Sequence, residues 1–288
     1  MRYLVTGGNG FIGTNLIKRL LKDGHEVTSI DNYLSGFVSN HQDGANYMFG
    51  DVSDLTILSD IKFDVVYHLA AIARIQPSFE NPVDTFRVNV IGTQAVVEWA
   101  KHNNVKDIYA GSSSQWHDPF QSPYAMYKKL GEDVCKMYRK VFGTNIEIAR
   151  FYNVYGPYEI TEGKWAAVIG KWRGQIQNGE PIIIVGDGEQ RRDFTHVDDI
   201  CKGLIRISED NWYGENFDLG RGVPVSILEL SKLWCDNESR ISFVPLRKNE
   251  GLHTESDYEK TYGMIGWRAQ VNLKDYIIKV KNKTEVLS

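Results

Sequence analysis

The 288-residue chain has few cysteines and few prolines. The first scarcity bears on disulfides and metal sites, and the second on flexible linkers. The three cysteines, Cys135, Cys201 and Cys235, are odd in number, widely spread and without His or Cys at metal-ligand spacing. They indicate free thiols in a reducing compartment, so we expect neither a disulfide framework nor a metal site. Only eight prolines are present, and no proline- or serine-rich linker divides the chain.

The sequence also lacks a strong excess of charge and any long apolar run. Its formal net charge of -4 gives no basic field for nucleic acid and no polybasic patch for an anionic membrane. No apolar stretch approaches the ~18 residues of a membrane span, and "RYLVT" at the start leads into glycines without the apolar region of a signal peptide. We therefore expect a cytoplasmic protein that binds a small molecule and neither nucleic acid nor membrane.

Strand-like and helix-like segments alternate through the first half of the chain. Helical periodicity at 14–24 and 92–104 lies between short β-branched or aromatic runs at 2–6, 25–30, 63–70, 106–113 and 146–152. This alternation predicts an α/β protein with right-handed βαβ units and a parallel sheet covered on both faces. The pattern becomes irregular after about residue 153. We expect one domain over 1–155 and a smaller lobe over 156–288, with segments near 194–220 returning to the sheet.

Three glycines, Gly7, Gly10 and Gly13, stand between the first strand and the first helix. Glycines at this point allow a tight turn and let the backbone approach a pyrophosphate at the helix N-terminus, where free N–H groups favour anions. We place Phe11 and Ile12 in the same cofactor site. The alternative is a hairpin turn at the Asn-Gly pair, but the flanking pattern is strand then helix. The segment thus predicts a Rossmann-type, doubly wound dinucleotide-binding domain.

Asp31 ends the second strand, where an acidic residue would accept hydrogen bonds from the adenine ribose. Asn32 follows it and no cation stands beside it for a 2′-phosphate, so we predict NAD rather than NADP. An exposed turn residue is the alternative for Asp31. Asp51 and Val52 are assigned to the adenine edge, and for Asp51 a plain turn is nearly as plausible.

Tyr124 and Lys128 are four residues apart in "QSPYAMYKKLGE" and share one face of a helix. A free tyrosine titrates near ~10, and lowering its pKa to about 7 needs roughly 4 kcal/mol of phenolate stabilisation. A neighbouring ammonium and a cationic nicotinamide would supply it. Most isolated pairs of this kind are merely exposed helix residues, but this pair follows a dinucleotide fingerprint and a serine run. We predict that it is catalytic.

The motifs occur in the order seen in a known family: "TGGNGFIG", "DVSD", "HLAA", "NVIGT", "SSS", "YAMYK", "RFYNVYGP", "GDGEQRRDF" and "GWRAQVNL". The chain resembles the extended short-chain dehydrogenase/reductase family, especially the nucleotide-sugar 4-epimerases of the UDP-glucose and UDP-N-acetylglucosamine type. The resemblance covers nearly the whole chain. It implies that Tyr124 is the acid/base and that Lys128 binds the nicotinamide ribose. It implies Ser113 as the hydrogen-bond partner, or Ser112 if the register slips by one.

The same resemblance implies further contacts with each ligand. Every cofactor contact has core packing as its alternative, and each arginine has a surface ion pair as its alternative. The implied cofactor residues are Leu69, Ala70, Ala71, Asn89 and Tyr152, and the implied nucleotide-sugar residues are Asn153, Val168, Arg192, Arg247 and Glu250. The two arginines would hold the diphosphate, because a planar guanidinium suits bidentate phosphate binding.

The implied reaction is inversion at C4 of a UDP-hexose or UDP-N-acetylhexosamine through a transient 4-ketosugar. Related dehydratases and decarboxylases carry an acidic residue just after the catalytic Thr or Ser, whereas Ser114 and Gln115 follow here. Dehydration is therefore the runner-up, and a catalytically silent NAD-binding regulator is the alternative of another class. Trp116 and His117 lie in a shortened loop between serine and tyrosine, which predicts an altered wall near the hexose.

Two further interpretations concern helices. His196, Asp198 and Asp199 could suggest a metal site, but a helix start with acidic first-turn residues is the better explanation. Apolar stripes on the helices near 89–103 and 123–142 resemble the family's four-helix contact, so we expect a homodimer. Packing within one subunit is the alternative for these stripes, which comprise Val96, Val97, Val134, Met137 and Val141.

Overall fold

The computed structural model describes residues 1–59, 61–116, 118–235, 237–247, 251 and 253–282. The chain forms two compact units. The first comprises 1–150 and 201–217, and the second comprises 151–200 and 218–288. The division into independent domains at residue 155 remains a prediction.

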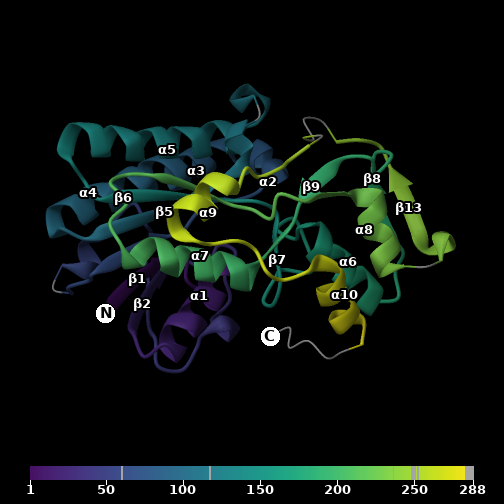
Figure 1. Cartoon of the computed structure of the whole chain (residues 1–288), viewed down its shortest axis with the longest axis horizontal. Helices are drawn as coiled ribbons and strands as arrows, with labels where there is room; N and C mark the ends of the chain where they lie inside the picture. The colour runs from purple at the N-terminus through teal and green to yellow at the C-terminus, as the bar shows by residue number, and fades with distance from the viewer. Residues whose placement is uncertain (60, 117, 236, 248–250, 252, 283–288) are drawn as a thin grey trace. The chain divides into compact units, whose positions relative to one another are not determined.

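A seven-stranded sheet in the order β11-β6-β5-β4-β1-β2-β3 forms the centre of the first unit (Figure 1). The pairs from β3 to β5 are parallel, as the alternating pattern predicted. The strand order reverses between β1 and β4, and open α/β sheets bind ligands at such a switch point. The strands are β1 (Arg2–Thr6), β2 (Glu26–Asp31), β3 (Asn46–Phe49), β4 (Val65–His68), β5 (Lys106–Ser112), β6 (Ile146–Phe151) and β11 (Asn216–Leu219).

Helices cover both faces of this sheet (Figure 1). Helices α4 (Thr93–Asn103) and α5 (Pro123–Phe142) lie on one face, and α1 (Phe11–Lys22) and α7 (Val197–Glu209) lie on the other. Side chains of α4, α5, β5 and β6 form a buried cluster of Val97, Tyr109, Cys135, Tyr138, Ile146 and Ile148. Two short helices, α2 (Ile75–Glu80) and α3 (Pro82–Phe86), and a π-helical turn at Arg87–Gly92 precede α4.

Local signals at both ends define α5. The Ser122 side chain accepts a hydrogen bond from the Ala125 N–H at 3.1 Å, and Pro123 occupies the first helical position. Gly143 ends the helix with a φ of 67°, a left-handed conformation that suits glycine. These signals fix where the helix begins, and hence the place of Tyr124 in its first turn.

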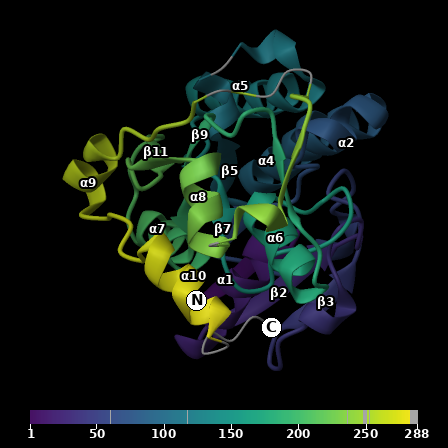
Figure 2. The same cartoon turned by 90° about the vertical axis from the view of Figure 1, so that its right-hand side faces the viewer.

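The second unit combines short strand pairs with helices α6 (Val168–Gln177), α8 (Ile227–Trp234), α9 (Glu259–Ile265) and α10 (Leu273–Lys281), which Figure 2 labels. Its strand pairs are β7 (Val154–Tyr155) with β10 (Thr195–His196), β8 (Ile182–Val185) with β13 (Ile241–Val244), and β9 (Arg191–Asp193) with β12 (Pro224–Ser226). Ser226 and Glu229 form a reciprocal capping box at the start of α8. The core includes Trp172, Ile184, Leu230 and Ile277.

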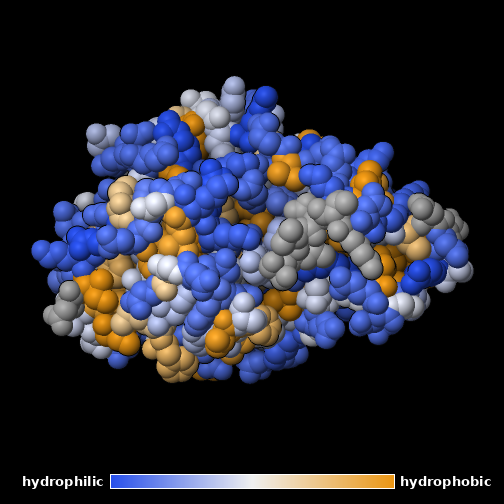
Figure 3. All heavy atoms as spheres, turned by 90° about the horizontal axis from the view of Figure 1, so that it is seen from below, coloured by the Kyte–Doolittle hydropathy of each residue, from blue (hydrophilic) through white to orange (hydrophobic). Residues whose placement is uncertain are grey.

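Polar side chains cover most of the face in Figure 3, and apolar groups on it are scattered. Within the described part of the chain, every helix is too short or too polar to cross a membrane.

Candidate active site

The glycine-rich loop joins β1 to α1 and is closed by its own backbone. Gly10 N–H donates to the Gly7 carbonyl at 3.2 Å, and Thr14 N–H donates to the Gly10 carbonyl at 2.9 Å. Gly7 has a φ of +69°, and a Cβ there would lie 2.8 Å from the backbone of Ala70. A Cβ on Gly13 would lie 2.6 Å from the Cα of Gly8. Only glycine fits these two positions, and the loop leaves the first N–H groups of α1 without a capping side chain.

Asp31 is held against this loop at the end of β2. Its carboxylate accepts the Asn9 N–H at 2.9 Å and the Tyr33 N–H at 2.8 Å. It is buried, and burial raises its pKa while the two backbone N–H groups oppose that rise. The predicted ribose-binding carboxylate thus lies beside the predicted pyrophosphate loop, which is the arrangement an adenosine diphosphate needs.

Both carboxylate oxygens of Asp51 accept hydrogen bonds from other residues of the protein. Its Oδ1 accepts hydrogen bonds from the N–H and hydroxyl of Ser53, and its Oδ2 accepts one from Arg87 at 2.8 Å and a longer one from Asn32 at 3.4 Å. Partial burial would raise its pKa, but the bonds from Arg87 and Ser53 prevail and bring it to about 2. These contacts are those of a turn residue, while a role at the adenine edge stays a prediction. Val52 is buried.

The segment after β4 is hydrogen-bonded to the end of β1 and to the π-helical turn before α4. Ala70 N–H donates to the Thr6 hydroxyl at 3.2 Å, and Leu69 N–H donates to the Thr6 carbonyl at 3.2 Å. The Asn89 amide makes two bonds to the backbone of Ile72, at 2.8 and 3.1 Å. Leu69 and Ala70 therefore lie against Gly7 of the glycine loop, and Asn89 holds the chain just beyond them. The predicted cofactor contacts of Leu69, Ala70, Ala71 and Asn89 stay predictions.

His68 was not singled out from the sequence, yet it links this segment to α4. Its ring nitrogens lie 2.8 Å from the Thr6 hydroxyl and 3.1 Å from the Thr93 hydroxyl. Burial, and then the charge of Lys128, lowers its pKa to about 3, so the ring is neutral at physiological pH. The signal for it was the polar residue in the otherwise apolar run "VVYHLA".

Tyr124 meets Ser112. The Tyr124 hydroxyl lies 3.1 Å from the Ser112 Oγ, which also accepts the Ser114 N–H at 3.1 Å. The predicted partner of Tyr124 is Ser113, with Ser112 as the alternative, and the hydrogen bond in the structure is to Ser112. Strand β5 ends at Ser112, and Ser113 begins the following 3₁₀ turn, so the two side chains leave the backbone in different directions.

Tyr124 has a raised pKa in the free protein. Burial raises it, whereas the hydrogen bond with Ser112 and the charge of Arg74 lower it. The phenol is therefore protonated at neutral pH until further positive charge arrives. This state suits an acid/base group that becomes reactive only when a cationic cofactor is bound.

Lys128 is buried one turn further along α5. Its Nζ donates to the Ala110 carbonyl at 2.6 Å and lies 4.6 Å from the centre of the Tyr109 ring. Burial lowers its pKa to about 8, against the opposing influence of Cys135 and Glu132. It is protonated at pH 7, and it is fixed by β5 rather than free to swing.

Trp116 stands in the shortened loop and rests on a buried ion pair. Its ring centre lies 5.3 Å from the Arg150 guanidinium, which binds Glu132 in a bidentate pair at 2.6 and 3.0 Å. Trp116 itself is 62% exposed. His117, predicted to share this wall, lies outside the described residues.

Within the second unit, two of the predicted residues are hydrogen-bonded to segments distant in the sequence. The Asn153 amide donates to the Asp193 carbonyl and the Thr254 hydroxyl, each at 3.0 Å, and its φ of 30° is unusual for a residue other than glycine. The buried Tyr152 hydroxyl donates to Asp218 at 3.0 Å. The implied contacts of Asn153 with the nucleotide sugar and of Tyr152 with the cofactor stay predictions.

The remaining predicted substrate residues are spread over three segments of the second unit. Val168 begins α6, and Arg192 on β9 donates to the carbonyls of Arg191 and Gly251. Arg247 follows β13 and is exposed. Glu250 lies outside the described residues, so its contact with the nucleotide sugar remains a prediction.

Asp193 was missed in the sequence, although it organises the strand that carries Arg192. The buried carboxylate accepts the N–H groups of Arg221, Gly222 and Ser256 at 2.9 to 3.1 Å. Burial raises its pKa, and the three N–H groups act in the opposite direction. The only sequence signal was an acidic residue within the strand "RRDF".

The helix-start interpretation of "THVDDI" is confirmed. Helix α7 begins at Val197 with Asp198 and Asp199 in its first turn. Asp199 accepts the N–H groups of Gln270 and Val271, each at 2.8 Å. Across the residues that the structure describes, no group of three or more His, Cys, Asp or Glu could hold a metal ion.

The chain matches the model of the NAD dependent epimerase/dehydratase family over residues 3–220. The chain belongs to this family. Among similar proteins is a UDP-glucose 4-epimerase of Mycolicibacterium smegmatis, 31% identical over 99% of this chain and 100% of its own. A UDP-glucose 4-epimerase of Methanocaldococcus jannaschii, described as putative, is 30% identical over 97% of each chain. UDP-glucuronic acid decarboxylase 4 of Arabidopsis thaliana is 30% identical over 95% of this chain, which spans 66% of that protein.

Solved structures show the same fold in more than one kind of enzyme. A UDP-glucose 4-epimerase of Thermotoga maritima with UDP-glucose superposes with a TM-score of 0.90, at 28% identity and 99% coverage of both chains. A dTDP-glucose 4,6-dehydratase of Streptomyces venezuelae with NAD bound also gives 0.90, at 26% identity, covering 98% of this chain and 96% of its own. The predicted fold class and family are confirmed, and the cofactor is NAD. The relatives include epimerases, decarboxylases and dehydratases. They show that the chain is an enzyme of this family, and they do not identify which of these reactions it catalyses.

Proposed function

We propose that this protein is an NAD-dependent nucleotide-sugar 4-epimerase acting on a UDP-linked hexose or N-acetylhexosamine. The observation that supports the proposal most is the contact between the hydroxyls of Tyr124 and Ser112, with Lys128 fixed one turn away on the same helix. The hydroxyls of Tyr124 and Ser112 can share a proton with a hydroxyl of a bound sugar. The glycine loop and Asp31 fit the pyrophosphate and ribose of NAD, because no side chain caps the N-terminus of α1 and the Asp31 carboxylate is held against the loop by the Asn9 N–H.

The proposed reaction assigns each residue a step. Bound NAD supplies a hydride acceptor for C4 of the hexose and afterwards the hydride donor. Tyr124 removes the proton from O4 and later returns it, while Ser112 orients that hydroxyl. The resulting 4-ketosugar turns about its diphosphate linkage and is reduced on its other face. Arg192 and Arg247 are proposed to hold the diphosphate, so that the nucleotide end is bound firmly and the sugar end is mobile.

Residue types after the serine favour epimerisation over dehydration. A dehydratase of this family needs a second proton transfer, for which an acidic residue follows the catalytic Thr or Ser. After Ser112 come Ser113, Ser114 and Gln115, all of which are neutral, and neither a hydroxyl nor an amide is a general base at neutral pH. The silent-regulator alternative is disfavoured because the pair Tyr124 and Lys128 is intact.

A panel of UDP- and dTDP-hexoses, incubated with the enzyme and NAD, tests the proposed function. We expect a stereoisomer of unchanged mass, identified by proton spectra at C4. A persistent 4-keto-6-deoxy product that absorbs in alkali would instead identify a dehydratase. If neither product forms with any member of the panel, the catalytic proposal is wrong.

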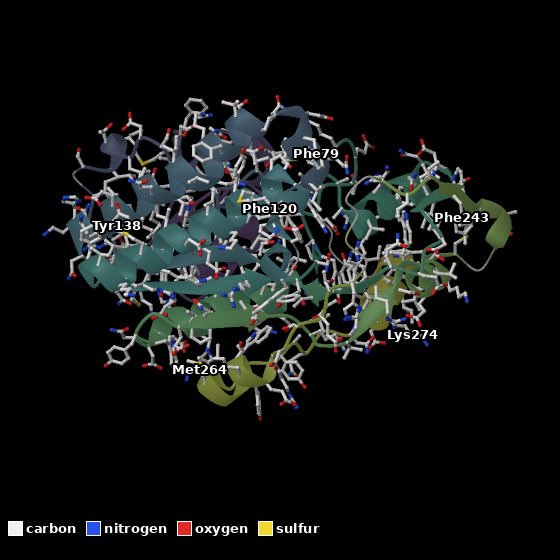
Figure 4. All side chains as sticks on the ribbon, turned by 90° about the horizontal axis from the view of Figure 1, so that it is seen from above. Phe79, Phe120, Tyr138, Phe243, Met264 and Lys274 are labelled. Carbon is white, nitrogen blue, oxygen red and sulfur yellow. The ribbon has the colours of Figure 1, made fainter. Side chains whose placement is uncertain are left out.

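We also propose a cytoplasmic homodimer that pairs through α5. Val96 and Val97 of the predicted stripe are buried within the subunit, but Met137, Val141 and Phe142 are 41%, 62% and 51% exposed. Figure 4 looks onto α5, on which Tyr138 is labelled. An apolar strip of this kind on a helix surface suits a second copy related by a two-fold axis.

Placing a charge in this strip should separate the subunits. We expect Val141→Asp to sediment as a 32.8 kDa monomer and the unaltered protein at twice that mass, because an unpaired carboxylate in an apolar contact carries a large desolvation cost. The control Ile278→Asp, on the exposed side of α10, should remain a dimer. An unaltered protein that is already monomeric at micromolar concentration would contradict the proposal.

A further inference from the structure

The carboxylate of Asp193 joins segments of the second unit that are far apart in the sequence. Asp193 ends β9 and is completely buried. Its Oδ1 accepts the Arg221 N–H at 3.1 Å, and its Oδ2 accepts the Gly222 N–H at 2.9 Å and the Ser256 N–H at 3.0 Å. One side chain therefore fixes the loop after β11 and the segment before α9 to the same strand. We call these two stretches, residues 220–222 and 253–257, the anchored loops.

The anchored loops are packed directly against each other. A Cβ on Gly220 would lie 2.2 Å from the Cβ of Ser256 and 2.8 Å from the Asp193 carboxylate. A Cβ on Gly222, which has a φ of +71°, would lie 2.6 Å from the Tyr258 ring. Only glycine allows so close an approach at these two positions. The Asp193 carboxylate thus binds a tightly packed crossing of two loops.

Further hydrogen bonds join the second anchored loop to residues that are predicted to bind the nucleotide sugar. The Thr254 hydroxyl accepts the Asp193 N–H at 3.2 Å and an N–H of the Asn153 amide at 3.0 Å. The Arg192 guanidinium donates to the Gly251 carbonyl, just before this loop. Asn153 and Arg192 are therefore bonded to the same stretch of chain that the Asp193 carboxylate holds.

A carboxylate is the side-chain group that these three N–H donors require. It has two acceptor oxygens and no donor, whereas the amide of asparagine has one acceptor oxygen and an NH₂ group. With asparagine in place of Asp193, the NH₂ would face either the Arg221 N–H or the N–H groups of Gly222 and Ser256. Two donors that face each other in a buried site are unfavourable, so at least one anchored loop would have to move.

We propose that Asp193 is a positioning residue for nucleotide-sugar binding: it fixes the anchored loops against β9 and so holds Arg192 and the chain after Arg247 in the arrangement that the diphosphate needs. This inference rests on the proposed function. Asp193 acts through its neighbours, because Arg192 precedes it on β9 and Arg247 precedes the second anchored loop in the sequence. Guanidinium groups that are already in place lose less conformational entropy when a diphosphate binds.

The test compares Asp193→Asn with the matched control Asp199→Asn. Asp199 is also buried in the second unit, and its carboxylate accepts the N–H groups of Gln270 and Val271, outside the anchored loops. Thr254→Val is a second test variant, which removes the hydroxyl bonds to the second anchored loop and leaves the Asp193 carboxylate in place. It provides the same measurements if Asp193→Asn does not fold.

Calorimetry with UDP and with dTDP measures the binding of a nucleoside diphosphate without a sugar. For the nucleotide that binds, we expect Asp193→Asn to raise the Kd by about 10- to 50-fold, Thr254→Val by about 3- to 10-fold, and Asp199→Asn by no more than about twofold. The Kd for NAD should stay within about twofold in all three variants, because the glycine loop and Asp31 belong to the first unit. On the nucleotide sugar that the enzyme converts, Asp193→Asn should raise KM and change kcat by less than about threefold.

Hydrogen exchange of the protein without ligand, followed by mass spectrometry, is the second measurement. Amides of the anchored loops should exchange about 10-fold faster in Asp193→Asn and at the unaltered rate in Asp199→Asn. Unchanged exchange in Asp193→Asn would overturn the proposal. Equal losses of UDP affinity in Asp193→Asn and Asp199→Asn would also overturn it, because a general loss of stability produces that result. If the unaltered protein binds neither UDP nor dTDP, the proposed function fails, and the exchange rates still decide whether Asp193 fixes the anchored loops.

Discussion

Replacing Tyr124 by phenylalanine is expected to lower kcat for inversion at C4 by about 10³-fold or more while leaving the Kd for NAD within about twofold. The substitution removes only the hydroxyl that contacts Ser112 and keeps the ring that fills the first turn of α5. No other described hydroxyl is placed against Ser112 by a hydrogen bond. Steady-state rates on the active sugar and equilibrium titration with NAD measure the two quantities.

Tyr127 provides the matched control on the same helix. Its ring lies edge-to-face with Phe86, with centroids 5.3 Å apart, three residues along from Tyr124. Tyr127→Phe should retain activity within about threefold, because a ring in this packing keeps its shape when the hydroxyl is lost. Substantial turnover by Tyr124→Phe, or equal losses in both variants, would show that the hydroxyl of Tyr124 is not the proton acceptor.

Local signals made much of this site predictable from the sequence. The serine cap, the first-turn proline and the terminal glycine of α5 act within a few residues of one another, so the place of Tyr124 and Lys128 on one helix face could be derived. The glycine loop was equally local, since it lies between one strand and the next helix. Both predictions depended on neighbours in sequence that are also neighbours in space.

The choice between Ser112 and Ser113 depends on where β5 ends relative to α5, which begins eleven residues later. Side chains alternate along a strand, so a shift of one residue exchanges which serine meets the tyrosine. Nothing in the run of three serines fixes that register. The sequence therefore left Ser112 and Ser113 both open, and the hydrogen bond in the structure is between Ser112 and Tyr124.

Long-range partners are the part of the site that the sequence did not predict. Asp51 is bound by Arg87, 36 residues away, and Asn153 by the backbone of Asp193, 40 residues away. Such contacts follow from tertiary packing, and a pattern of residue types does not encode them. His68 and Asp193 escaped notice for the same reason: a single buried polar residue in a strand shows its role only through its partners.

Asp107, on β5, is a buried carboxyl outside the active site. It is completely buried, and neither of its oxygens has a hydrogen-bond partner among the described residues. The cation that acts on it electrostatically is Arg139, whose guanidinium donates to Ile146, Glu215 and Asn216 instead. Burial raises the pKa of Asp107 to about 8, and Arg139 only partly opposes this. The folded protein therefore holds a neutral carboxylic acid here at pH 7.

This carboxyl should make the free energy of unfolding fall with rising pH. In the unfolded chain Asp107 titrates near ~3.9. Between about pH 4 and pH 8 the folded state thus binds one more proton than the unfolded state, and stability declines through that window by up to about 1.4 kcal/mol per pH unit. Above pH 8 this contribution levels off. Glu147 is also buried with a raised pKa and adds a slope of the same sign, which Asp107 variants share.

Asp107→Asn is therefore expected to be more stable than the unaltered protein at pH 9 by a few kcal/mol, and to differ little at pH 5, because the amide is neutral at both. Urea denaturation at the two pH values measures the difference between the variants, from which the common contribution of Glu147 cancels. Asp43→Asn, at an exposed position, should leave the pH dependence unchanged. Asp107→Asn and the unaltered protein could instead lose stability in parallel from pH 5 to pH 9. That result would show that Asp107 is ionised in the folded state. Groups on α5 and β5 would then have to stabilise its charge by interactions other than the hydrogen bonds of the described residues.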